Sequence, residues 1–145
     1  MNIKKKNGNN SCMKSMINND FIKCGIAGWC IELLFTSVCS FKKKNYKLEG
    51  HSSLWMFPVY GMASVIKPLS YRLKSNNRKT IERGTVYTVG IFGIEYVTGS
   101  ILKRHNQCPW DYSKNKYNIN GVIRLDYAPL WFILGLFFEK ILTKD

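Results

Sequence analysis

The chain has 145 residues and a net charge of +13, from 22 basic and 9 acidic residues, and its length allows one domain at most. Its apolar residues, 46% of the total, gather into blocks separated by Lys- and Asn-rich segments, which excludes an ordinary soluble core. The basic residues flank these blocks without an aromatic-rich stripe, so they indicate the lipid bilayer and its anionic head groups as partners, and no nucleic acid.

The N-terminal part of the chain combines a polar tail with a first apolar helix. Residues 1–20 form the tail, which we expect to be partly disordered, and residues 21–142 form a helical transmembrane domain. The first helix is predicted over about 21–41. Its stretch 24–41 is 18 residues long and carries one charge, Glu32. A helix that crosses a bilayer takes roughly 20 residues, so we expect this one to be retained as a membrane anchor.

Two further helices follow along the chain. The second is predicted over about 53–73, where Pro58 and Pro68 predict kinks that neighbouring helices can tolerate. The third is predicted over 84–102, a stretch of 19 residues whose single charge is Glu95. It is therefore also long enough to cross a bilayer.

A polar third loop, 103–120, connects the third helix to the last one. His105, Cys108 and Asp111 have a three-residue spacing that a metal ion could use, but Pro109 interrupts any helix there and each ligand type occurs once. We therefore expect no metal. No other cofactor is indicated, because neither of the two histidines lies in the middle of an apolar run.

The last helix is predicted from near Tyr127 to Leu142, and from as early as Val122 if it crosses the whole membrane. With four spans, the side of the membrane that carries both termini has 13 Lys and Arg residues and the other side has 9. This bias favours cytoplasmic termini. The predicted fold class is all-α: a multi-pass helical membrane protein of the bacterial cytoplasmic membrane with about four transmembrane helices.

Glu32 and Glu95 are the candidate functional residues, because an ionisable side chain at membrane depth is costly and rarely faces lipid. Small and polar residues recur at helical spacing around them, which predicts that the polar faces of the first three helices pack against one another around this buried acidic pair. The predicted polar lining consists of Thr36, Tyr60, Ser64, Lys67 and Thr98.

Three arrangements of these two carboxyl groups are open. Two nearby carboxylates in a medium of low dielectric do not both ionise readily, so at least one would hold a proton. Alternatively, each acid pairs with a base, for which the candidates are Lys67, Arg83, Arg104 and Arg124. In the third arrangement, protonated glutamates only hold helices together through hydrogen bonds worth about 0.6–2 kcal/mol each.

Aromatic and charged residues near the predicted helix ends are expected at the membrane interface. They are Trp55, Trp110, Asp111, Tyr112, Arg124 and Asp126. Arg124 and Asp126 lie two residues apart at the entrance to the last helix, so we expect them either to form ion pairs with other elements or to stay solvated.

Several ordered motifs resemble a family of small bacterial membrane proteins described as putative ABC-transporter type IV, or CmpB-like permeases, to which the transmembrane protein 229 group is similar. The resemblance covers residues 29–139. The residues that carry it lie at 29–35, 50–61, 94–99, 108–113 and 121–131. It implies a multi-pass helical fold and a role in transport, with no catalytic residues carried over.

Three classes of function are compatible with these observations. The first is a transporter permease-like subunit, which would act as a homo-oligomer or with a separate ATPase subunit, since the chain contains no G-x-x-x-x-G-K-[ST] motif. The second is a small intramembrane enzyme that acts on a lipid or isoprenoid and uses Glu32 or Glu95 as acid or base. The third is a regulatory membrane protein that binds a partner.

Overall fold

A computed structural model of the chain describes residues 3–42, 44, 46–47 and 49–143, with the side chains of the first helix from Asn19 onward. Most of the described chain is helical. The elements in chain order are α1 (Ile3–Lys42), α2 (Met56–Gly61), the 3-10 helix η1 (Met62–Val65), α3 (Ile66–Ser75), α4 (Thr80–Arg104), β1 (Asn118–Ile119), β2 (Ile123–Arg124), the 3-10 helix η2 (Leu125–Tyr127) and α5 (Ala128–Leu142).

The observed bounds agree with the predicted helices in part. α4 extends the predicted third helix by a few residues at each end, and α5 begins one residue after Tyr127 rather than at Val122. α1 begins at Ile3, well before the predicted start, while Met1 and Asn2 lie outside the described residues. The predicted second helix is divided into α2, η1 and α3. Pro68 explains the division, because it offers no N–H to the carbonyl of Ser64 and its ring crowds that carbonyl, which favours tighter 3-10 turns there.

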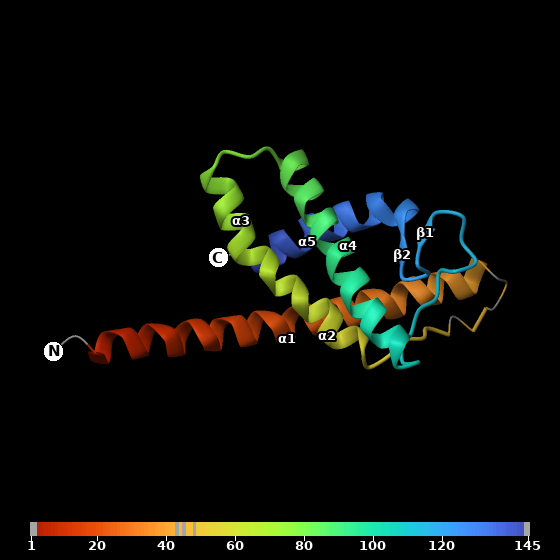
Figure 1. Cartoon of the computed structure of the whole chain (residues 1–145), viewed down its shortest axis with the longest axis horizontal. Coiled ribbons are helices and arrows are strands. Elements are labelled where there is room, and N and C mark those ends of the chain that lie inside the picture. The colour runs from red at the N-terminus through yellow and green to blue at the C-terminus, as the bar shows by residue number, and fades with distance from the viewer. Residues whose placement is uncertain (1–2, 43, 45, 48, 144–145) are drawn as a thin grey trace.

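The helices do not lie side by side in a bundle with their polar faces all turned toward a common centre. α1 packs mainly on α2 and η1, whereas α4 packs mainly on α5. In Figure 1, α1 lies along one side of the molecule and α3 and α4 rise from it, so α1 runs across these helices. The prediction that the first three helices pack their polar faces against one another holds for α1 and α2, where Gly28 lies against Tyr60 and Glu32 accepts its hydroxyl hydrogen bond, but not for α4, which packs mainly on α5. Apolar side chains of α5, among them Leu134 and Phe138, fill the core between them.

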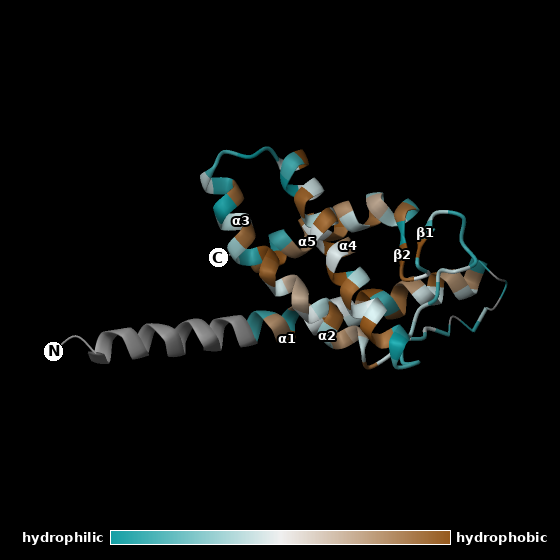
Figure 2. Cartoon of the chain, in the orientation of Figure 1, coloured by the Kyte–Doolittle hydropathy of each residue, from teal (hydrophilic) through white to brown (hydrophobic). Residues whose placement is uncertain are grey.

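Two of the described helical segments are long and apolar enough to cross a membrane, Asn19–Lys42 and Thr80–Arg104. α5 has 15 residues, which gives a length of roughly 22 Å against a hydrocarbon core of about 30 Å. Figure 2 shows that α5 and much of α4 are hydrophobic, while the turn between α3 and α4 is hydrophilic. This distribution points to a membrane location for the helical part of the chain.

A cluster of charges joins α3, α4 and α5 at the end of the molecule where that turn lies. Glu139, only 4% exposed, accepts a hydrogen bond of 3.0 Å from the Ser70 hydroxyl. Its carboxylate also pairs with Arg83 Nε at 3.2 Å and with Lys74 Nζ at 3.1 Å. The buried charge thus has two bases and a hydroxyl around it, as a stable buried ion pair requires.

We predict that Glu139→Gln destabilises the fold more than Glu82→Gln does. Removing the Glu139 charge leaves the largely buried Arg83 without its partner, a change that costs about 3–5 kcal/mol in buried pairs. Glu82 pairs with Arg78 at 3.6 Å on the surface, where such pairs contribute about 1 kcal/mol or less. Thermal unfolding of the purified variants in detergent measures both effects. Equal shifts in Tm would contradict a structural role for the Glu139 cluster.

Candidate functional site

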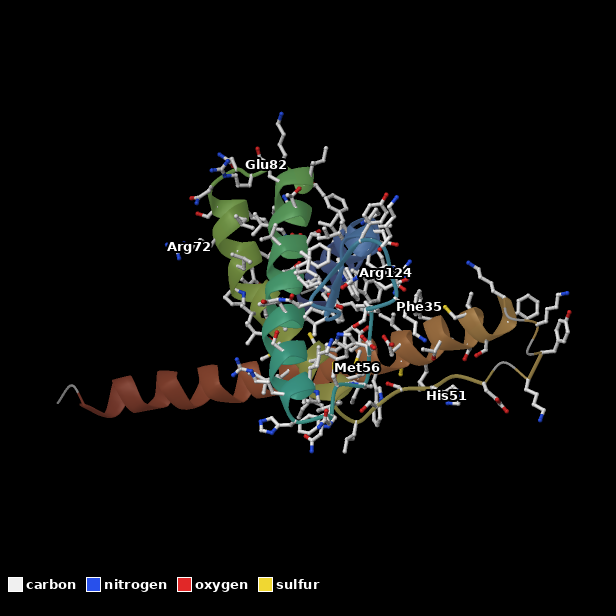
Figure 3. All side chains as sticks on the ribbon, turned by 45° about the vertical axis from the view of Figure 1, so that its right-hand side comes forward. Phe35, His51, Met56, Arg72, Glu82 and Arg124 are labelled. Carbon is white, nitrogen blue, oxygen red and sulfur yellow. The ribbon has the colours of Figure 1, made fainter. Side chains whose placement is uncertain are left out.

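A cavity of about 440 Å³ lies where α1, α2, α4 and α5 come together beneath two loops. The loops are the segment before α2, which includes His51, and the segment after α4, which includes Trp110. The volume is within the range of about 300–1,000 Å³ that is typical of small-molecule sites. Figure 3 labels Phe35, His51 and Met56 from its lining, and shows them away from Arg72 and Glu82 at the other end of the molecule.

The cavity extends from an exposed rim to a buried floor. His51, Ser52 and Pro109 line it and are exposed, so they mark the rim beside the two loops. Trp131 and Phe138 of α5 also line it and are buried, with exposed fractions of 9% and 1%. The site is therefore open to the surroundings at the loop end and closed by α5 at its base.

Both candidate acids line this cavity. Glu32 of α1 accepts a hydrogen bond of 2.7 Å from the Tyr60 hydroxyl, and Tyr60 is itself held in the core by its contacts with α1 and Phe138. Glu95 of α4 is only 7% exposed, and its Oε2 is buried without a hydrogen-bond partner among the described residues. The two carboxyl groups are near enough for their charges to interact. One cavity thus holds an acid bonded to a hydroxyl and an acid whose Oε2 makes no hydrogen bond among the described residues.

Neither acid makes a salt bridge within the described part of the chain. The bases that could have paired with them are placed elsewhere: Lys67 pairs with Asp20 at 2.9 Å, Arg83 pairs with Glu139, and Arg124 pairs with Asp126 at 2.7 Å. Arg104, at the end of α4, is exposed and contacts neither carboxyl group through an ion pair. The alternative in which each acid is neutralised by one of these bases is therefore wrong.

The predicted polar lining is only partly at the cavity. Thr36 and Tyr60 line it, whereas Ser64, Lys67 and Thr98 do not. Ser64 lies in η1, where three residues per turn in place of 3.6 change the direction in which side chains face. Thr98 donates a hydrogen bond of 2.6 Å to the Ile94 carbonyl of its own helix. Lys67 is engaged with Asp20, an acid that the helical spacing did not single out.

The third loop contributes two of the predicted interfacial residues to the cavity, Trp110 and Tyr112. Trp110 is fixed by a hydrogen bond of 2.9 Å from its indole N–H to the Val122 carbonyl. Burial raises the pKa of the Tyr112 hydroxyl, so this group stays protonated at the cavity wall. Trp55, Asp111, Arg124 and Asp126 are not part of the lining.

A small β-hairpin, which the predicted elements do not include, positions this loop. β1 and β2 pair antiparallel, and Asn120 and Gly121 between them have φ values of +53° and +70°. Two successive positive φ angles define the turn that Asn-Gly pairs favour in hairpins, so Asn120-Gly121 was the signal available in the sequence. A Cβ on Gly121 would also collide with the Ser113 and Lys103 side chains.

The charged interfacial residues interact locally. Arg124 binds the Asp126 carboxylate through Nε and through Nη2 and stacks on the Tyr127 ring at 4.4 Å, so the expected ion pairs of Arg124 and Asp126 with other elements are absent among the described residues. Hydrogen bonds from Ser113 hold the pKa of Asp111 below its usual range. Among the described residues no three His, Cys, Asp or Glu side chains are placed to hold a metal ion.

Aromatic side chains form much of the remaining lining, and no helical spacing predicted them. Phe35, Tyr127 and Trp131 come from α1, η2 and α5, and their rings are joined through Tyr127, which lies edge-on to both of the others at about 6 Å. The indole Nε1 of Trp131 is buried without a hydrogen-bond partner among the described residues. The site therefore combines two acids with an aromatic wall.

We predict that Gly28→Ala disturbs the site while Gly90→Ala does not. A Cβ on Gly28 would overlap the ring of Tyr60, whereas a Cβ on Gly90 would meet nothing within 4 Å. Overpacking of this kind typically costs about 1–3 kcal/mol, and it would displace the hydroxyl bonded to Glu32. A Gly→Ala change in a helix that introduces no steric clash stabilises the folded protein by up to about 1 kcal/mol. A fall in Tm for Gly28→Ala with no fall for Gly90→Ala is expected, and the reverse order would refute this packing.

Comparison with known proteins identifies one family for this arrangement. A family model described as putative ABC-transporter type IV matches residues 20–144. The match includes the whole lining of the cavity and both candidate membrane spans except Asn19. No solved structure matches the chain.

Proposed function

The chain belongs to the putative ABC-transporter type IV family, and on this premise we propose that it is a permease-like transporter subunit whose substrate site is the cavity between Glu32 and Glu95. The observation that carries the proposal is the buried carboxyl of Glu95, which has no basic partner and no hydrogen bond to its Oε2 among the described residues and which lines a cavity of ligand size from within a candidate membrane span. Acids in membrane segments commonly mark the path of a substrate or ion.

The proposal includes a multi-pass topology in the bacterial cytoplasmic membrane. In this topology Asn19–Lys42 and Thr80–Arg104 supply two of the crossings, which requires α1 to turn from the crosswise orientation seen in Figure 1 toward the direction of α4. The continuous helical stretch 56–75 and α5 would supply the others, with the bilayer thinned or the ends of α5 snorkelling to meet its short length. Both termini are then cytoplasmic, and the cavity rim faces the opposite side, beside the first and third loops.

Transport by so small a chain requires further subunits. The sequence contains no phosphate-binding G-x-x-x-x-G-K-[ST] loop, so an ATPase, if one drives the process, is a separate chain. A homo-oligomer would supply more helices around a pathway. The Glu139 cluster and the basic turn between α3 and α4 then lie on the cytoplasmic side, where an ATPase subunit would dock.

We predict that reporter fusions place both termini in the cytoplasm. The 13-to-9 distribution of Lys and Arg between the two sides supports this orientation. Paired fusions of alkaline phosphatase and a fluorescent protein before Met1, after Asp145, and within the loops at Asn77 and Asn115 measure it. We expect the Asn115 site alone to be external. An external C-terminus would mean that α5 lies on the membrane surface, and it would contradict four crossings.

We predict that a thiol in the cavity can be labelled from both sides of the membrane. Ala63 lines the cavity, and Val65, two residues on, is 59% exposed and would face lipid. In a background without native cysteines, Ala63→Cys should react with an impermeant maleimide in intact cells and also in inside-out vesicles. Val65→Cys, the matched control, should react in neither. Labelling from the rim side alone would contradict transport and favour an enzyme acting on a lipid or isoprenoid.

A further inference from the structure

The cavity differs in charge from the rest of the protein. The chain has a net charge of +13, yet the lining contains no Lys or Arg, and its charged groups are the carboxyls of Glu32 and Glu95. His51 also lines the cavity, at its exposed rim. The cavity is therefore suited to positive charge in a protein that is basic elsewhere.

The environment of the two acids leaves this charge uncompensated. Asp20 and Glu139, which with Glu95 are the buried acids of the described chain, each pair with a base at 3.2 Å or less. Half-buried Glu32 has only the Tyr60 hydroxyl, and Glu95 Oε2 has no hydrogen bond among the described residues. A buried carboxylate without a counter-ion is strongly disfavoured and takes up a proton instead, so a cation that entered the cavity would replace that proton beside Glu95, with Glu32 as the second acid.

The rest of the lining indicates what kind of cation fits. Trp110, Tyr112 and Trp131 contribute aromatic rings, whose faces attract cations by about 0.5–2 kcal/mol each, while the ring of Tyr127 already has Arg124 stacked on it. The remaining side chains are mostly aliphatic, and they would solvate a small, strongly hydrated ion poorly. An organic cation whose charge is surrounded by apolar groups meets both conditions.

Access to the cavity agrees with such a ligand. Phe35 of α1 and Leu130 of α5 line the cavity and are 37% and 38% exposed, so apolar side chains and no charged group stand at this part of its wall. In the proposed topology we expect this part of the wall to face lipid. A ligand dissolved in the bilayer would reach the two acids past these side chains without crossing a polar barrier.

We propose that the cavity binds a lipophilic organic cation, such as a quaternary ammonium or phosphonium ion or a protonated hydrophobic amine, with Glu95 as its principal counter-ion and Glu32 as the second. Glu32 is the weaker partner because the Tyr60 hydroxyl already occupies one of its oxygens. The aromatic wall surrounds the substituents of the ligand. This inference rests on the proposal that the cavity is a substrate site, and it names the class of substrate.

Two probes of the same shape and opposite charge test the proposal. Tetraphenylphosphonium and tetraphenylborate are added to the full-length protein in nanodiscs, and binding is measured by equilibrium dialysis against empty nanodiscs. We expect saturable binding of the phosphonium ion and at least tenfold weaker binding of the borate, although the net charge of the chain favours the anion. Glu95→Gln should weaken phosphonium binding at least tenfold and Glu32→Gln by less, whereas Glu82→Gln, remote from the cavity, should leave it unchanged.

A second measurement keeps both acids in place, in case the Gln variants fail to fold. Tetraphenylphosphonium should protect the Ala63→Cys thiol from maleimide, and tetraphenylborate should not. Equal protection by the two probes would overturn the cation preference. No binding and no protection by either probe would overturn the inference, while labelling of the Ala63→Cys thiol from both sides of the membrane would still support transport. One-sided labelling with phosphonium protection would instead contradict transport and uphold the cation site.

Discussion

Burial of charge away from water is the constraint on which the arrangement of these helices depends. Each of the other buried acids is paired where helices meet: Asp20 with Lys67 between α1 and α3, and Glu139 with Arg83 and Lys74 between α3, α4 and α5. These pairs use bases that could otherwise have neutralised the cavity. Glu32 and Glu95 are therefore left with hydroxyl, indole and aromatic neighbours, and the acidic character of the cavity follows from how the bases are distributed elsewhere.

Close helix contacts bring the two acids, carried by different helices, to one space. α1 approaches α2 through Gly25 and Gly28, which lie directly against the rings of Phe57 and Tyr60. Gly135 allows a similar approach of α5 to Tyr87 of α4. Each acid is thus carried by a helix that is packed tightly on a different neighbour. The space between the two pairs of helices is the cavity, and no direct packing of α1 on α4 is needed to bring Glu32 and Glu95 to it.

The apolar blocks in the sequence predicted the bounds of α4 and α5 closely, because each of these helices ends near the point where the sequence changes from apolar to polar residues. The start of α1 could not be found in this way, since residues before Asp20 are polar and helix formation there leaves no hydrophobic signal.

Glu32 and Glu95 stand out because single charges in apolar runs are visible locally. The pairing of Lys67 with Asp20, and the contribution of Trp131 to the cavity, join residues far apart in the chain, and periodicity within one helix holds no information about such contacts.

The hairpin between α4 and α5 separates the part of the loop that can change in sequence from the part that shapes the cavity. Trp110 and Gly121 fasten the loop at two points, through the bond to the Val122 carbonyl and through the bond from the Tyr112 N–H to the Gly121 carbonyl. Residues such as Lys114 lie between these points, exposed and away from the cavity. Substitutions in the exposed part of the loop can therefore change what this surface meets without altering the shape of the site beneath it.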